Sequence, residues 1–182
     1  VVMIVFNMII LRYAGNLGVA AYGIIANIAL VILSIFTGIS QGVQPIVSTN
    51  YGSQQYDNVQ KVLKYGIVVV CVLAIMIYIA SFAFAGPIVS VFNKEQDIEL
   101  ANIAVKGLRI YFTAFIFSGI NILLATYFGS IDRPKNAFII SILRGFIFII
   151  PSAFILSALW GMTGVWLAMP FTELVVLLFS MN

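Results

Sequence analysis

The feature that most constrains this 182-residue sequence is a succession of apolar runs that match the thickness of a bilayer. Five runs hold roughly 20 residues or more, and a helix of that length rises about 30 Å and crosses the hydrocarbon core. The chain is 63% hydrophobic and 8% charged, whereas soluble domains contain about 45–50% apolar and about 25% charged residues. The sequence therefore predicts an all-α integral membrane protein. Its composition excludes a soluble enzyme, a disordered chain and a nucleic-acid binder.

Residues 1–182 are interpreted as one transmembrane domain with one partial and five complete spans. The expected spans are residues 1–11, 22–47, 66–84, 105–128, 137–159 and 162–181. The first run rises only about 16 Å as a helix, half of what a bilayer requires. No basic segment precedes it, so we do not expect it to be a signal peptide. We interpret it as the end of a helix whose beginning is missing, and we expect the chain to be a fragment of a larger protein.

Small residues and a proline gather near the end of the second expected span. Gly38 and Gly42 lie on one helix face, where small residues allow another helix to approach closely. Pro45 lacks a backbone N–H, which predicts a bend or a helix end near Gln41. Two interpretations are open: a mobile, broken helix beside a transport pathway, and ordinary tight packing at a helix end.

Two charged residues lie well inside the last two expected spans, Arg144 and Glu173. A charged group near the bilayer centre costs at least about 2.5–3.5 kcal/mol, so both are candidate functional residues. They lie at similar depth on helices joined by a tight turn, and we expect them to meet. The pair is either a structural ion pair, or a carboxylate that binds a proton, sodium or a cationic substrate beside a tuning arginine. Pro151 and Pro170 can bend these helices and expose carbonyl groups to a cavity.

The remaining polar residues of interest inside the spans are amides, which either bond neighbouring helices or line a polar cavity. They are Asn27, Gln41, Gln44 and Asn121. Histidine is absent and Cys71 is the single cysteine, so we expect no metal site. No Walker loop or nucleophile elbow is present. We therefore expect no enzymatic activity and no cofactor, and any transport must be driven by an ion gradient or a partner subunit.

One stretch resembles a known family. Residues 38–52 read G-I-S-Q-G-V-Q-P-I-V-S-T-N-Y-G, which resembles the G-x-x-Q-G-x-Q-P-[ILV]-[ILV]-S-x-N-Y-G stretch of bacterial multidrug and toxic compound extrusion (MATE) transporters. Residues 164–170 (G-V-W-L-A-M-P) with Glu173, and Arg144 with Pro151, are similar to the last two helices of that family. The resemblance covers the second half of such a transporter. It implies a six-helix lobe, its first helix truncated, of a twelve-helix transporter with two lobes.

The resemblance also implies a function: export of drugs and organic cations by alternating access, coupled to inward movement of Na⁺ or H⁺. The implied partners are membrane lipid and the missing amino-terminal lobe, in a bacterial inner membrane with a cytoplasmic carboxy terminus. Some family members carry an acid in helix seven or ten, where this chain has Asn7 and Asn121. Glu173 is therefore the one acidic residue that lies deep enough inside the expected spans to take part in ion coupling. Two alternatives stay open: a lipid-linked oligosaccharide flippase of a related branch, with an anionic cargo, and a non-transporting membrane subunit or scaffold.

Overall fold

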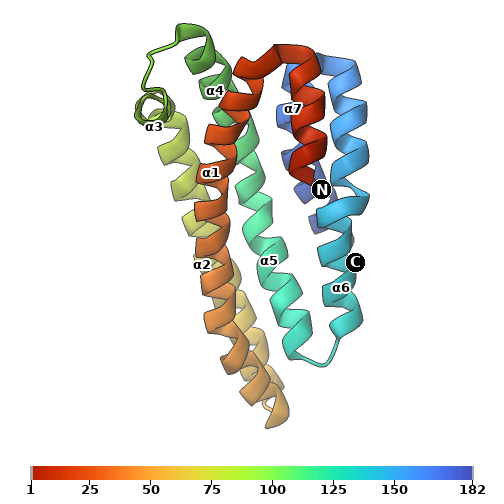
Figure 1. The fold of residues 1–182 in the computed structure, drawn as a ribbon. Coiled ribbons are helices and arrows are strands. Elements are labelled where there is room, and N and C mark those ends of the chain that lie inside the picture. Colours follow the sequence, from red (N-terminus) through yellow and green to blue (C-terminus); the bar gives the residue numbers. More distant parts are fainter. Residues whose placement is uncertain (1, 182) are drawn as a thin grey trace.

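The computed structural model describes residues 2–181, so the expected start of the first span at Val1 and the expected cytoplasmic position of Asn182 lie outside the described residues. Helices make up most of the described chain (Figure 1). They are α1 (Val2–Gly52), α2 (Tyr56–Ala83), α3 (Ala85–Phe92), α4 (Ile98–Tyr111), η1 (Phe112–Ala114), α5 (Phe115–Ser130), α6 (Pro134–Ile142), η2 (Leu143–Ile147) and α7 (Ile149–Ser180).

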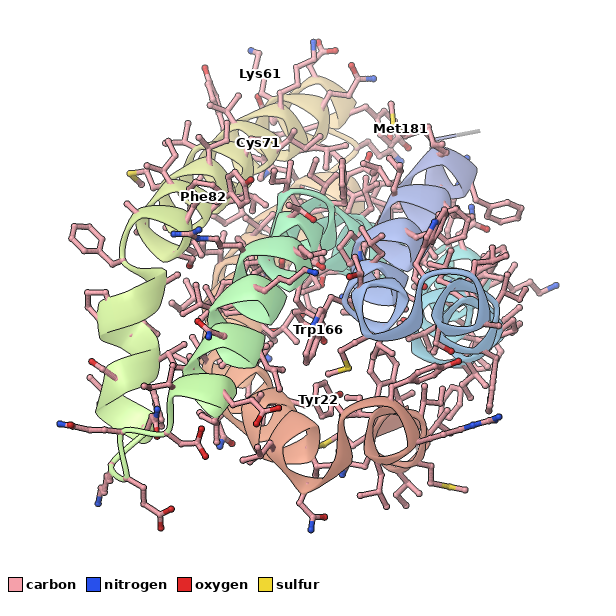
Figure 2. All side chains as sticks on the ribbon, turned by 90° about the horizontal axis from the view of Figure 1, so that it is seen from above. Tyr22, Lys61, Cys71, Phe82, Trp166 and Met181 are labelled. Carbon is pink, nitrogen blue, oxygen red and sulfur yellow. The ribbon has the colours of Figure 1, made fainter. Side chains whose placement is uncertain are left out.

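Four helical stretches are long and apolar enough to cross a membrane. They are Val2–Gly52, Tyr56–Ala83, Ile98–Ser130 and Pro134–Ser180. Large apolar side chains such as Met8 (69% exposed) and Val69 (51% exposed) cover their outer surface, and side chains project outward around the whole bundle when it is seen from above (Figure 2). Such a surface is stable in lipid and unstable in water. The all-α membrane fold class predicted from the sequence is therefore confirmed.

Two of the four stretches are broken at a glycine. Gly15 in α1 has φ 58° and ψ −154°, and Gly161 in α7 has φ 56° and ψ −134°, a backbone that favours glycine. A Cβ on Gly164 would meet the backbone of Leu156, eight residues earlier, although eight residues of straight helix span about 12 Å. The chain therefore doubles back at Gly161, and Figure 1 shows a similar reversal after the first segment of α1. Whether each arm crosses the membrane separately, giving six spans with the expected bounds, remains a prediction.

The helices extend further than the apolar runs. Residues 48–65 were expected to form a loop, but α1 continues to Gly52 and α2 begins at Tyr56, so only residues 53–55 separate the two helices. Polar residues continue a helix wherever its backbone hydrogen bonds are kept and its side chains reach water, so the end of apolarity does not mark the end of the helix. Pro45 lies inside α1, whose one non-helical residue is Gly15. The helix end considered near Gln41 is therefore absent, and a bend there remains a prediction.

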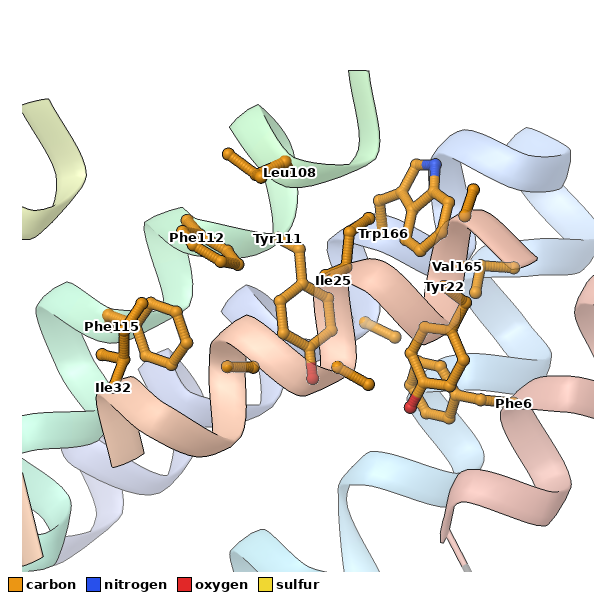
Figure 3. Close-up of a cluster of buried hydrophobic side chains, with 14 of the residues drawn as sticks. Phe6, Tyr22, Ile25, Ile32, Leu108, Tyr111, Phe112, Phe115, Val165 and Trp166 are labelled. Carbon is orange, nitrogen blue, oxygen red and sulfur yellow. The ribbon is translucent and has the colours of Figure 1, made fainter. Parts of the chain in front are cut away.

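The main apolar core lies where α1, α4, α5 and α7 meet (Figure 3). Trp166 of α7 is 1% exposed, and Phe112 and Phe115 at the junction of η1 and α5 are fully buried. Gly107 makes this packing possible, because a Cβ there would lie 2.7 Å from both Ile25 and Trp166. The core therefore fixes α4, α5 and α7 against α1, and these four elements supply most of the candidate site.

Candidate substrate and ion site

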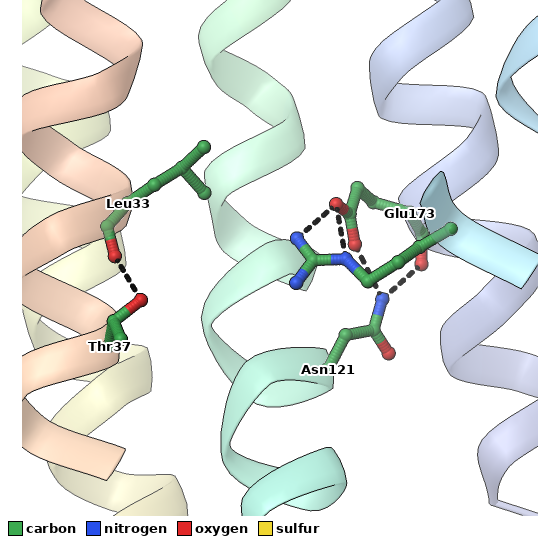
Figure 4. Close-up of polar contacts among 5 residues, drawn as sticks. Leu33, Thr37, Asn121 and Glu173 are labelled. Atoms are coloured by element: carbon green, nitrogen blue, oxygen red, sulfur yellow. Dashed lines mark hydrogen bonds and ion pairs between the residues drawn. The ribbon is translucent and has the colours of Figure 1, made fainter. Parts of the chain in front are cut away.

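A buried polar cluster joins three helical elements (Figure 4). Arg144 donates from Nη2 to Oε1 of Glu173 at 2.6 Å and from Nε to the same oxygen at 3.2 Å. Asn121 donates from Nδ2 to Oε2 of Glu173 at 2.7 Å and to its backbone carbonyl at 2.9 Å. Each carboxylate oxygen therefore has a donor. The expected meeting of Arg144 and Glu173 is confirmed, while the role of the pair in transport remains a prediction.

Arg144 is placed by an irregular turn of helix. It lies in η2, a π-helical turn in which the N–H of Phe148 donates to the carbonyl of Leu143, five residues back, at 3.0 Å. Pro151 follows, and it has no N–H to offer the carbonyl of Ile147 one turn earlier. Single π turns inside α-helices occur frequently at functional sites. The sequence analysis expected a bend from Pro151 but did not predict the π turn that carries Arg144.

Glu173 lies in the second arm of α7, one turn after Pro170. The missing N–H of Pro170 leaves the carbonyl of Trp166 without its usual helical donor. The backbone of α7 nevertheless stays helical there, since its one non-helical residue is Gly161. The expected bend at Pro170 is therefore not a break in the helix, and its size remains a prediction.

The two charges of the cluster differ in their access to solvent. The side chain of Glu173 is 1% exposed and that of Arg144 is 20% exposed. A cavity of about 570 Å³ borders the pair, lined mainly by α1, α5 and the segment around η2. Both residues line this cavity, and the side chain of Arg144 is the more exposed of the two.

The cavity wall is otherwise apolar and aromatic. Tyr22 of α1 and Tyr111 of α4 (Figure 3) line it, and neither hydroxyl has a hydrogen-bond partner within residues 2–181. The wall hydroxyls of Thr37 and Thr126 instead donate to carbonyls of their own helices, at 2.8 Å and 3.1 Å. The wall groups without a hydrogen-bond partner in residues 2–181 are therefore Nη1 of Arg144 and the two tyrosine hydroxyls. Sequence reasoning missed both tyrosines, because the sequence of an apolar run does not determine which of its side chains point into a cavity.

The amides predicted to line a cavity do not share one location. Asn121 is fully buried beneath Glu173 rather than in the wall. Asn27, Gln41 and Gln44 are exposed on α1 and lie outside this cavity. Their part in a larger cavity remains a prediction.

The glycine face of α1 is open. A Cβ on Gly38 or on Gly42 would meet no atom within 4 Å. Tight packing of these glycines against another helix of this chain, one of the two sequence interpretations, is therefore not found. The face is free for a neighbour outside residues 2–181.

Three buried oxygen atoms close to the cluster in sequence lack partners within the described chain: Oγ of Ser118, Oδ1 of Asn121 and Oγ1 of Thr172. Ser118 lies one turn before Asn121, and Thr172 directly precedes Glu173. Unpaired buried polar atoms are uncommon and usually indicate a bound water, an ion or a functional role.

Comparison with known proteins places these observations in a family. The sequence matches the MatE family over residues 1–155. The multidrug export protein MepA of Staphylococcus aureus (strain MSSA476) is 31% identical over 162 residues, which is 89% of this chain and 35% of that protein. MepA of Staphylococcus saprophyticus is 25% identical over the same length and coverage. The chain therefore spans about a third of the length of the curated relatives it matches.

Solved structures agree in fold. The outward-facing conformation of a multidrug resistance MATE family transporter superimposes with a TM-score of 0.91 at 16% identity, over 98% of this chain and 40% of that chain. The inward-facing conformation of such a transporter gives a TM-score of 0.92 at 16% identity, over 98% of this chain and 41% of that one. The fold described here fits both conformations equally well.

Proposed function

Because the chain belongs to the MatE family, we propose that it forms the carboxy-terminal lobe of a secondary-active multidrug exporter. The proposal rests above all on the Arg144–Glu173–Asn121 cluster, which lies beside a cavity in a protein otherwise built for lipid. Buried ionisable groups in a membrane are expensive, and those that persist usually mark substrate or ion pathways. The close relatives are named as multidrug export proteins. In this proposal the amino-terminal lobe lies outside the chain, and the transporter belongs to a bacterial inner membrane with its carboxy terminus in the cytoplasm.

The cavity suits small organic cations with apolar bodies. Aliphatic walls bury the body of such a substrate, and Tyr22 and Tyr111 add aromatic surface to the wall. The free tyrosine hydroxyls can accept or donate to polar substituents. A wall with few fixed polar groups discriminates poorly between shapes, which is what a multidrug exporter requires.

Ion coupling in this proposal works by exchange of partners at Glu173. The carboxylate is occupied by Arg144 and Asn121, so it attracts a new cation only when Arg144 withdraws. A proton, or Na⁺ held also by the unpaired oxygens of Ser118, Asn121 and Thr172, would then neutralise Glu173. A ligand shifts an equilibrium only by its difference in affinity between two states. The coupling ion would therefore favour the state in which the ion pair is open.

Alternating access would follow from movement of this lobe against the other one. The fold fits outward-facing and inward-facing structures with nearly equal TM-scores, which favours a lobe that moves as one body. Parallel lobes that rock around a central site are an established transporter architecture. The open face of α1 around Gly38 and Gly42 is suited to meet the partner lobe, because small residues allow close approach.

One observation favours a second candidate function. Both charges of the pair line the cavity, and the Arg144 side chain, at 20%, is more exposed than the Glu173 side chain, at 1%. An arginine that is more exposed than its acidic partner suits an anionic cargo, as a lipid-linked oligosaccharide flippase would carry.

The test is export of a fluorescent organic cation by bacterial cells that express the complete transporter. Glu173→Gln removes the charge and keeps the shape, so we expect export to fall at least tenfold. Glu95→Gln is the matched control, because Glu95 is an exposed acid in the loop before α4, and its export should equal that of the wild type.

The other outcomes separate the alternatives. Export retained in Glu173→Gln would keep the family function and make the cluster structural. Absence of export by the wild type, with the protein present in the membrane, would favour the flippase or a scaffold. Sodium and proton coupling are then distinguished by repeating the assay in sodium-free buffer and with a protonophore.

A further inference from the structure

A basic groove lies between α3 and α4, away from the cavity described above. Two adjoining hollows of about 410 Å³ and 510 Å³ share Ala101, Asn102 and Val105 of α4. The smaller hollow is bounded by Phe82 at the end of α2 and by Lys106 and Arg109 of α4. We call these two hollows together the α3–α4 groove.

The cations of the groove have no acidic partner. Lys106 and Arg109 are one turn apart on α4 and both are exposed, and the one salt bridge within the described residues is Arg144–Glu173. Arg109 is positioned by Phe82, whose ring centroid lies 4.8 Å from the guanidinium carbon. This contact orients Arg109 but leaves its charge unneutralised. Two fixed positive charges are therefore available to an anion in the groove.

The nearby acids do not reach these cations. Asp97 caps α4 by accepting from the N–H groups of Glu99 and Leu100, at 2.8 Å and 3.0 Å. Glu99 lies seven residues before Lys106, about 10 Å along the helix. Asp97 and Lys94 line the larger hollow, whereas Lys106 and Arg109 bound the smaller hollow, nine and twelve residues beyond Asp97.

The cations lie where a long apolar stretch begins. Directly after Arg109 the sequence is apolar from Ile110 through η1 into α5, so we infer that the hydrocarbon core begins after Arg109, a few residues later than the expected span that starts at residue 105. Around the groove, Phe84, Val91 and Ile98 are 59%, 71% and 77% exposed. Exposed apolar side chains beside basic residues are typical of protein surfaces that lie in the headgroup region.

We propose that the α3–α4 groove binds an anionic phospholipid, with its phosphate held by Lys106 and Arg109 and its acyl chains against Phe82 and Phe84. A zwitterionic lipid carries a choline or ethanolamine cation that these residues repel. A free phosphate would lack the acyl contacts with the exposed apolar rim. The groove is therefore selective for a lipid with net negative charge.

Native mass spectrometry of the complete transporter tests the proposal. The purified protein is delipidated and titrated with phosphatidylglycerol or phosphatidylcholine of identical acyl chains, and inorganic phosphate is added as a competitor. Each cation near an anionic headgroup contributes about fivefold in affinity, so Lys106→Gln with Arg109→Gln should weaken phosphatidylglycerol binding roughly 25-fold. Binding of phosphatidylcholine should not change, and phosphate should not displace the lipid.

The matched control is Lys61→Gln with Lys64→Gln. These two exposed lysines have the same spacing on α2 but lie outside every cavity described here. Removing them should leave the affinity for phosphatidylglycerol unchanged. An equal loss of phosphatidylglycerol affinity in both double variants would overturn the proposal, because the lipid would then respond to the total positive charge of the protein and not to the groove. Equal binding of both lipids by the wild type, or displacement by phosphate, would also overturn it.

Discussion

The Arg144–Glu173 pair leads to a quantitative prediction about stability. Removing one partner of a buried ion pair costs about 3–5 kcal/mol, because the other charge is left uncompensated. Arg144→Gln leaves a carboxylate that is 1% exposed, whereas Glu173→Gln leaves a guanidinium that is 20% exposed beside a cavity. We therefore expect Arg144→Gln to cost about 4 kcal/mol. Glu173→Gln should cost about 2 kcal/mol, because its amide still offers an acceptor to Arg144.

The double variant, Arg144→Gln with Glu173→Gln, isolates the interaction itself. Neither glutamine carries a charge, so the double variant leaves no buried charge uncompensated and should be at least about 2 kcal/mol more stable than the sum of the single losses predicts. The assay is unfolding of the detergent-solubilised complete transporter by SDS, followed by tryptophan fluorescence. Glu95→Gln and Arg12→Gln are controls that should change the free energy of unfolding by no more than about 0.5 kcal/mol.

Two results would refute this reasoning. The first is a loss of stability in the double variant that equals the sum of the two single losses to within about 0.5 kcal/mol. It would mean that the pair contributes no coupling energy in the folded protein. The second is a larger loss in the free energy of unfolding for Glu173→Gln than for Arg144→Gln. It would mean that solvent access does not decide which unpaired charge destabilises the protein more.

Three further predictions concern the backbone, the packing and the cavity. Gly161→Ala should lower the free energy of unfolding by about 1–3 kcal/mol in the same SDS assay, because φ is 56° there; an unchanged value would mean that the turn relaxes freely. Gly119→Ala should cost about 1–3 kcal/mol, since its Cβ would press on side chains of α1 and α2, and a stabilised variant would contradict the packing. In a Cys71→Ser background, Glu95→Cys should react with a small maleimide and Asn121→Cys should not, because Glu95 is exposed in the loop before α4 and Asn121 is fully buried; equal labelling would contradict the placement of Asn121.

Sequence reasoning succeeded where the partners are close along the chain. Arg144 and Glu173 lie on the two sides of Gly161, so a tight turn and the helical rise were enough to predict that they meet. Asn121 was recognised as an intramembrane amide, yet its bond to Glu173 could not be predicted. The two residues are 52 positions apart, and their contact depends on how α5 packs against α7.

Local backbone conformation was the second feature that could not be predicted from the sequence. The π turn around Arg144 consists of a hydrogen bond between residues five positions apart instead of four, and no residue type specifies such a turn. Likewise, tight packing was one of two interpretations of the spacing of Gly38 and Gly42, and the sequence could not say that no packing partner lies within residues 2–181. The orientation of Tyr22 and Tyr111 toward the cavity depended on the same tertiary arrangement.

The reversal at Gly161 has a consequence for how the protein enters the membrane during synthesis. With a single glycine as its tip and no polar loop between the arms, the segment from Pro134 to Ser180 is expected to leave the translocon as one hairpin rather than helix by helix. Arg144 and Glu173 lie on opposite arms, so the guanidinium and the carboxylate can neutralise each other before either meets the acyl chains. The tight turn would thereby spare the nascent chain the separate transfer of two ions into lipid.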